Sequence, residues 1–197
     1  MPSARSDIRS AARVVVCLGL ATPLLASPAR SAILDQVWLG GFAHSINYLG
    51  DAKESGTADA QLEIDSTPPA LLRPIGSPRV NATLSLNTAG LTDFASLGLT
   101  WRRKLVGRLE GSLDAGLGFG DGVTNPPPGP LGDYDRTHRL LLGSKLLFRA
   151  AAGVDWRIDS RWSIGAEFVH LSNGHIFNRD HNEGINDAGL RLGYRFR

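Results

Sequence analysis

A serine and a histidine near the C-terminus are the residues of this sequence whose types and spacing best suit catalysis. The segment Phe168-Val-His-Leu-Ser-Asn-Gly174 places His170 and Ser172 two positions apart. In an extended strand, residues two apart project from the same face, within hydrogen-bonding reach of each other. A serine hydroxyl beside an imidazole is a nucleophile beside its general base. The pair therefore predicts acyl transfer, such as the hydrolysis of an ester.

Asn186 is the best candidate for a third member of this site. It shares the even-numbered phase of Ala188 in the next strand, which runs back antiparallel, so we expect it to lie beside His170. An asparagine can fix the imidazole tautomer, as it does in triads that lack a carboxylate. Glu183, in the preceding loop, and Asp187, which parity turns to the opposite face, are weaker candidates.

The elements that must position these residues are strands, because apolar residues recur with a period of two and not 3.6. Along each segment the apolar side chains point to one face of the strand and the polar side chains to the other. This alternation predicts eight strands. Leu140 and Leu142 are assigned to the apolar face of the sixth. The segments are 37–45, 58–65, 79–87, 95–102, 108–119, 140–157, 162–168 and 190–196.

Aromatic residues and connection lengths indicate that the apolar face meets lipid. Tryptophan, tyrosine and phenylalanine lie at strand ends, namely Trp101, Trp156, Trp162, Tyr194 and Phe196. Short connections (104–106, 158–161) alternate with long ones (46–57, 120–138, 173–185). Transmembrane barrels have short periplasmic turns, longer extracellular loops and aromatic girdles. The sequence thus predicts an all-β fold, an eight-stranded antiparallel transmembrane β-barrel.

Charges of both signs fall on the polar faces of these strands, so we expect a filled polar interior and no open pore. The acidic residues of this set are Glu63, Glu110, Asp114, Asp155 and Glu167, and the basic ones are Arg102, Lys145, Arg149 and Arg191.

The first 32 residues have the features of a secretory signal peptide, which leaves 33–197 as a single barrel domain. Arg5, Arg9 and Arg13 precede an apolar stretch and then small residues up to Ala32. The whole chain has 197 residues and a formal charge of +2, but residues 33–197 hold 17 basic and 18 acidic residues. A net charge of −1 argues against a nucleic-acid partner. A lone cysteine, Cys17, excludes an intramolecular disulfide.

Other motifs carry little chemistry. The glycine-rich segment 117–122 lacks the lysine and the helix that follow the glycines of a phosphate-binding loop. The pair His175 and His181 has no second pair of residues at the spacing of zinc ligands. His44 and His138 stand isolated in the sequence and are interpreted as surface or lumenal histidines. We therefore expect no metal and no cofactor.

The stretch from His170 to Phe196 resembles the C-terminal signature of outer-membrane lipid A 3-O-deacylases. Weaker similarity extends over Trp38–His44, Arg73-Pro74, Gly98–Trp101 and Leu142–Phe148. The resemblance implies an eight-stranded outer-membrane barrel of Gram-negative cells that hydrolyses the 3-O acyl ester of lipid A. It assigns Ser172 as the nucleophile and His170 as the base. Asn173 matches the asparagine that follows the serine, and with the backbone of Gly174 it is a candidate for the oxyanion hole.

One position departs from the family pattern, which can carry a glutamate where Asn186 stands. A neutral asparagine orients the histidine but stabilises imidazolium less than a carboxylate does. The same residue types occur in outer-membrane phospholipase A, which leaves lipid A or lipopolysaccharide and phospholipid as alternative substrates. A non-catalytic structural barrel and a soluble, ligand-binding secreted barrel also remain open, as does a homodimer.

Overall fold

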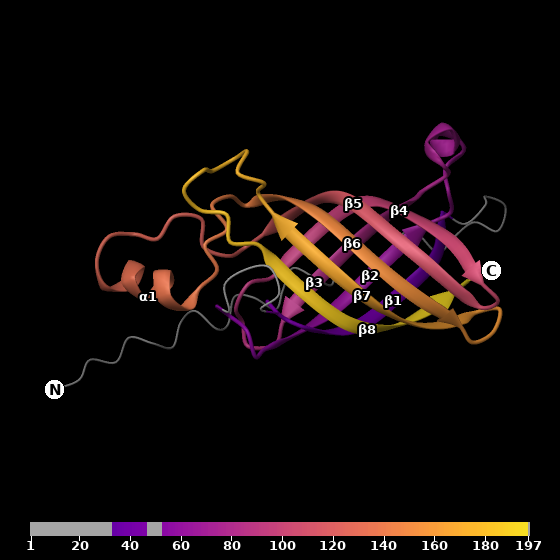
Figure 1. The fold of residues 1–197 in the computed structure, drawn as a ribbon, viewed down its shortest axis with the longest axis horizontal. Coiled ribbons are helices and arrows are strands. Elements are labelled where there is room, and N and C mark those ends of the chain that lie inside the picture. The colour runs from indigo at the N-terminus through magenta and orange to yellow at the C-terminus, as the bar shows by residue number, and fades with distance from the viewer. Residues whose placement is uncertain (1–32, 47–52, 197) are drawn as a thin grey trace. The chain divides into compact units, whose positions relative to one another are not determined.

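The computed structural model describes residues 33–46 and 53–196, and within them eight antiparallel strands close into a barrel (Figure 1). Each strand pairs with its neighbours in the sequence, and β1 closes the barrel against β8. The strands are β1 Leu34–Ala43, β2 Ala58–Ser66, β3 Arg79–Asn87, β4 Phe94–Val106, β5 Leu109–Gly120, β6 Leu146–Arg157, β7 Trp162–Ser172 and β8 Ile185–Arg195. The predicted fold class is confirmed. The proposed signal peptide, residues 1–32, lies outside the described residues.

Long and short connections separate onto the two ends of the barrel. The loop end, as we name it, carries the long connections 44–57, 121–145 and 173–184 and the shorter 88–93. The 121–145 connection contains the helix α1, Pro130–His138, which projects beyond the strands (Figure 1). The opposite turn end carries 67–78, with the 3-10 helix η1 (Ala70–Ile75), and the tight turns 107–108 and 158–161. No helix among the described residues is both long and apolar enough to cross a membrane.

Exposure alternates along the strands as the period of two requires. Leu97 and Leu190 are each 66% exposed on the outer face, whereas Ser96 is 6% and Arg191 3% exposed inside. A monomeric soluble barrel would not leave large aliphatic side chains exposed in a continuous band. In a transmembrane barrel those side chains contact lipid, and closure leaves no unpaired strand edge in the hydrocarbon.

The sixth strand is shorter than predicted. It begins at Leu146, so the assignment of Leu140 and Leu142 to an outward apolar face is wrong. Both side chains are fully buried in an apolar cluster with inward residues at the loop end, among them Leu147, Leu171 and Ile185. The interior is therefore polar along its middle and contains an apolar cluster at the loop end. The chain returning from α1 packs its leucines against the inward apolar side chains there, because this burial removes them from water.

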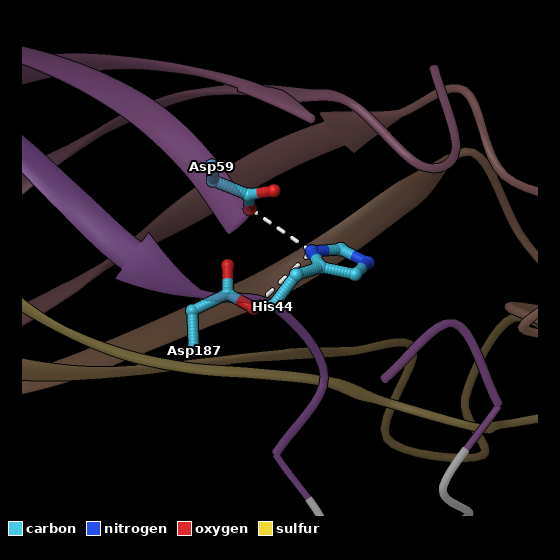
Figure 2. Close-up of side chains that lie close together, drawn as sticks. All are labelled: His44, Asp59 and Asp187. Carbon is cyan, nitrogen blue, oxygen red and sulfur yellow. Dashed lines mark hydrogen bonds and ion pairs between the residues drawn. The ribbon is translucent and has the colours of Figure 1, made fainter. Parts of the chain in front are cut away.

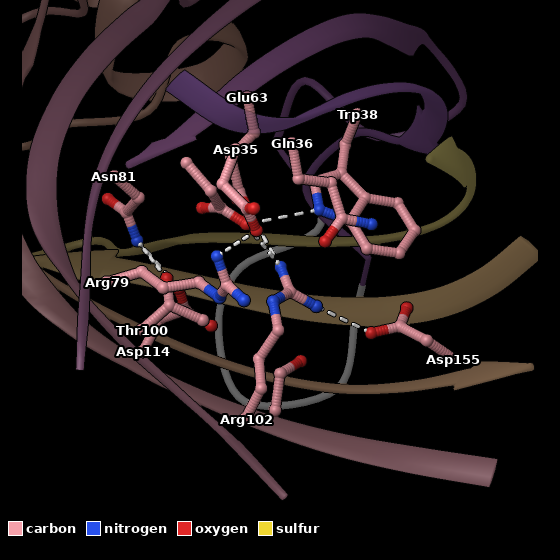
Figure 3. Close-up of polar contacts among 12 residues, drawn as sticks. Asp35, Gln36, Trp38, Glu63, Arg79, Asn81, Thr100, Arg102, Asp114 and Asp155 are labelled. Atoms are coloured by element: carbon pink, nitrogen blue, oxygen red, sulfur yellow. Dashed lines mark hydrogen bonds and ion pairs between the residues drawn. The ribbon is translucent and has the colours of Figure 1, made fainter. Parts of the chain in front are cut away.

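Interlocked charges fill the middle of the lumen. Arg102 Nη1 lies 2.7 Å from Asp155 Oδ2 (Figure 3). Arg102 Nη2 lies 3.0 Å from Asp65 Oδ2. Arg191 bonds Glu167 at 2.5 Å and Asp155 at 3.1 Å. The indole of Trp38 lies against both guanidinium groups, 4.7 Å from that of Arg102 and 4.4 Å from that of Arg191. These contacts agree with the predicted filled interior.

One of the predicted lumenal charges lies elsewhere. Lys145 precedes β6, and its Nζ donates to the backbone carbonyls of Asp121 and Gly122 at the loop end. Parity fails for Lys145 because it lies before the first residue of β6. Glu110 keeps the inward phase, since it pairs with Asp155 across β5 and β6, and it bonds Arg157 at 2.7 Å near the turn end.

An Arg191→Leu substitution is expected to lower the free energy of unfolding by about 3–5 kcal/mol, because it removes the nearest cation of the buried Glu167 carboxylate and one of the two arginines that bond Asp155. Urea unfolding of the protein in detergent micelles measures the change. Arg136→Leu, in the exposed surface of α1, makes the same chemical change and should shift stability by about 0.5 kcal/mol or less. Equal effects for the two variants would contradict the assigned role of the lumenal network.

Candidate active site

The register of β7 and β8 brings the three predicted residues together. His170 pairs directly with Asn186 across the two strands, and Ser172 lies two residues further along, where β7 ends. His170 Nε2 lies 3.1 Å from Ser172 Oγ, and His170 Nδ1 lies 2.7 Å from Asn186 Oδ1. Ser172, His170 and Asn186 thus form one continuous hydrogen-bonded line.

The hydrogen bond to Asn186 selects the tautomer of His170. An amide oxygen can only accept, so the proton lies on Nδ1, which donates to Asn186 Oδ1. Nε2 is then free to accept the hydroxyl proton of Ser172. This is the protonation pattern that a general base requires.

The three side chains share the outward phase of their strands at the loop end. Ser172 and His170 are half-buried, and Asn186 is 2% exposed beneath them. A substrate can therefore reach the hydroxyl from the outer face of the barrel, while the asparagine that orients the histidine is shielded from solvent. The even-numbered phase of the two strands predicted that Ser172, His170 and Asn186 lie on the apolar outer face, and the structure agrees.

Gly184 allows the loop to pass close to His170. A Cβ at this position would lie 2.8 Å from His170 Cε1 and 2.9 Å from the carbonyl oxygen of Leu171. Contacts this short do not occur with real side chains, so any larger residue must displace the imidazole or the strand. Sequence reasoning did not single out Gly184, because only the tertiary contact reveals its role.

A Gly184→Ala variant is therefore expected to keep the folded barrel and lose activity by at least about tenfold, since displacement of a catalytic group is costly. Rates of ester hydrolysis and heat-modifiable migration on gels measure the two properties. Gly41→Ala, at an exposed position of β1 where a Cβ meets nothing within 4 Å, is the control for folding. Full activity in Gly184→Ala would contradict this account.

Asn173 is bonded differently from the expectation that it lines the oxyanion hole. Its backbone N–H donates to Asn182 Oδ1 at 2.8 Å, and its Nδ2 donates to the carbonyls of Leu142 and His181 at 2.7 and 2.6 Å. The side chain is fully buried. These donors hold the 173–184 connection in shape, so in this structure they are engaged with the protein's own acceptors. The residue is a structural anchor next to the serine.

Gly174 remains a candidate donor. It is exposed, has a positive φ of 62°, and its N–H makes no hydrogen bond with any described residue. It lies two residues beyond Ser172, at the start of the connection that Asn173 anchors.

The two alternative acids are engaged elsewhere. Glu183 accepts from Lys53 Nζ at 2.6 Å and from the backbone N–H of Leu141 at 2.8 Å. Asp187 points into the barrel, as parity predicts, and accepts from the backbone N–H of Ser45 at 3.0 Å. Among the described residues, the side chain that bonds His170 Nδ1 is that of Asn186.

His44 is a lumenal histidine, one of the two positions that the sequence interpretation allowed, but it is not isolated. It is 1% exposed inside the loop end, with Asp59 2.9 Å from Nδ1 and Glu54 3.2 Å from Nε2. Burial alone would lower the pKa of His44, but hydrogen bonds to these carboxylates outweigh burial and raise the pKa to about 10. Burial opposes the charge of Glu54 as well, yet His44 and Arg139 lower its pKa to about 2. The only sequence signal is that His44 continues the inward phase of Trp38 and Phe42.

Part of this sequence matches a known protein family. A model of the lipid A 3-O-deacylase (PagL) family matches residues 95–195, a little over half of the chain, including His170, Ser172 and Asn186. The chain belongs to the lipid A 3-O-deacylase family. The recognised resemblance is thereby confirmed, and membership with the barrel fold supports an outer-membrane lipid A deacylase.

Solved structures agree with this family at the level of the fold. The crystal structure of the outer membrane enzyme PagL is 18% identical, covers 80% of this chain and 97% of its own, and superposes with a TM-score of 0.55. The N-terminal β-barrel domain of Pseudomonas aeruginosa OprF is 14% identical over 82% and 98% of the two chains, with a TM-score of 0.50. A de novo designed transmembrane β-barrel is 11% identical over 84% and 98%, also at 0.50. No curated protein matches the sequence.

Proposed function

We propose that this deacylase-family barrel is a serine esterase that removes the 3-O acyl chain of lipid A with Ser172 as nucleophile, His170 as base and Asn186 as the residue that orients the base. The observation that carries the proposal is the hydrogen-bonded line of these three residues on the outer face, at distances of 3.1 and 2.7 Å. A structural barrel gains nothing from such a line on its lipid-facing side.

In the acylation step, Ser172 Oγ attacks the ester carbonyl while His170 Nε2 takes its proton. The carbonyl carbon becomes tetrahedral, and its oxygen acquires negative charge, which the N–H of Gly174 stabilises. Collapse of the intermediate breaks the bond to the sugar oxygen, and His170 returns the proton to that leaving oxygen. The acyl chain is then attached to Ser172.

In the deacylation step, water attacks the acyl-enzyme and gives its proton to His170. The second tetrahedral intermediate collapses, the proton returns to Ser172 Oγ, and the fatty acid leaves. Asn186 accepts from Nδ1 throughout and keeps Nε2 directed at the reacting atoms. Every proton taken by His170 is returned, so the cycle regenerates the starting enzyme.

The place of the site on the barrel suits an outer-leaflet lipid. The loop end of an outer-membrane barrel faces outward from the cell, and Ser172 lies where β7 meets the 173–184 connection. At that level the ester of a lipid lies next to the hydroxyl while its acyl chains remain in the hydrocarbon. We include in this proposal that residues 1–32 are a signal peptide that directs export of the chain.

The experiment uses the protein purified from outer membranes in detergent, with purified lipid A as substrate. Release of a 3-hydroxy fatty acid, with the matching loss of mass from lipid A, is expected in mass spectra. A parallel incubation with phospholipid tests the alternative substrate. Fatty acid released from phospholipid and not from lipid A would replace the proposed substrate, and no release from either would favour a non-catalytic barrel.

A further inference from the structure

Three side chains at the loop end of the lumen converge on a small buried volume (Figure 2). His44 Nδ1 lies 2.9 Å from Asp59 Oδ2 and 3.4 Å from Asp187 Oδ1, and one ligand atom from each residue lies within 4.8 Å of the other two. The residues are 1%, 2% and 0% exposed. His44 directly follows β1, and Asp59 and Asp187 lie near the starts of β2 and β8, the two strands that pair with β1.

Two carboxylates of this cluster face the same nitrogen of His44, those of Asp59 at 2.9 Å and of Asp187 at 3.4 Å. Asp187 Oδ2 is buried without a hydrogen-bond partner among the described residues. A buried carboxylate oxygen that lacks a partner is costly. The shared nitrogen and the unpaired oxygen both point to a positively charged species between the two aspartates.

The surroundings of His44 match those of a metal-bound histidine. Its second nitrogen, Nε2, lies 3.2 Å from Glu54 Oε2. Glu54 is itself held by Arg139 Nε at 2.6 Å and by the backbone N–H groups of Thr92 and Leu140. Histidines that bind metals donate their other N–H to a carboxylate held in this way, which fixes the ring and its tautomer.

We propose that His44, Asp59 and Asp187 bind a divalent metal ion of the zinc class in the lumen, separate from the esterase site. The ion is coordinated by His44 Nδ1 and by the two carboxylates. It replaces the proton on Nδ1, which is released to solvent. A neutral imidazole, two carboxylates and a divalent ion then carry no net charge, and Glu54 is balanced by Arg139.

The donor set selects the ion. One imidazole nitrogen with two carboxylates suits zinc, which takes about four nitrogen and oxygen ligands. The unpaired Oδ2 of Asp187 can provide the fourth donor if that carboxylate binds through both oxygens. Calcium requires about six to eight oxygen ligands, more than these residues supply.

The test is a zinc titration of the detergent-purified protein by isothermal calorimetry. The exposed His138 and His175 and the half-buried His181 are first replaced by asparagine, so that zinc bound by these three histidines does not contribute. We expect one saturable equivalent of zinc in this histidine background and an increase in its Tm. Asp187→Asn has the same size and removes a buried charge, so it should fold, and we expect it to weaken zinc binding at least thirtyfold.

Asp180→Asn is the matched control, because it neutralises an exposed aspartate in the 173–184 connection and should leave zinc binding unchanged. Heat-modifiable migration confirms that each variant is folded. Absence of saturable zinc binding in the histidine background would overturn the proposal. So would an Asp187→Asn variant that binds zinc as tightly as its parent, and in either case a bound proton, not an ion, balances the cluster.

Discussion

Replacing Ser172 by alanine is expected to reduce deacylation of lipid A by about 10⁴- to 10⁶-fold, the range found when a catalytic serine is lost. The hydroxyl is the only part of the side chain that reacts, and its Oγ lies 3.1 Å from His170 Nε2. Alanine keeps the backbone and the outward phase of β7. Binding of the lipid, and the orientation of His170 by Asn186, should therefore persist while covalent catalysis disappears.

Mass spectrometry of released 3-hydroxy fatty acid measures the loss, with heat-modifiable migration as evidence of folding. Ser160→Ala makes the same chemical change in the exposed 158–161 turn, at the opposite end of the barrel, and should retain full activity. A Ser172→Ala variant that deacylates at more than about a tenth of the parent rate would rule out Ser172 as the nucleophile.

Asn186→Asp is expected to raise the deacylation rate by about 10- to 100-fold. The aspartate has the same length as the asparagine, so a carboxylate oxygen can occupy the position of Oδ1, 2.7 Å from His170 Nδ1. His170 gains positive charge in both transition states, and a carboxylate stabilises that charge better than an amide dipole does. One to two orders of magnitude correspond to about 1.4–2.7 kcal/mol of transition-state stabilisation.

Asn186→Ala should change the rate in the opposite direction, by about 10- to 100-fold, because the imidazole loses the acceptor that holds its proton on Nδ1. Initial rates with lipid A measure both variants. Asn125→Asp adds the same negative charge to an exposed position of the 121–145 connection and should not raise the rate. If Asn186→Asp were no faster than the parent, stabilisation of imidazolium by this position would be disproved.

The alternating pattern of the sequence predicted the strands and the outward position of the candidate catalytic residues. Residues two apart in a strand share a face whatever the rest of the chain does, so His170 and Ser172 could be paired from their numbers alone. The phase of β8 likewise placed Asn186 outward and Asp187 inward, and the structure agrees with both. Parity depends only on local backbone geometry, which is why it succeeds within strands.

Parity does not apply beyond the strands, and there the tertiary structure decided the outcome. Leu140 and Leu142 pack into the apolar cluster inside the barrel. Lys145 donates to a backbone carbonyl of the 121–145 connection. Asn173 donates to the carbonyl of Leu142 and so anchors the 173–184 connection. In each case the partner lies on a segment remote in the sequence or on an irregular path, and a period of two carries no information about it.

His44 shows the same limit most clearly. Its neighbours Asp59 and Asp187 lie 15 and 143 positions away, and closure of β1 against β8 brings them into contact. The sequence by itself determined that this chain forms strands with unlike faces and that one outward face carries a histidine, a serine and an asparagine. The closed barrel alone decided which buried charges meet, because contacts across a lumen depend on the register of all eight strands together.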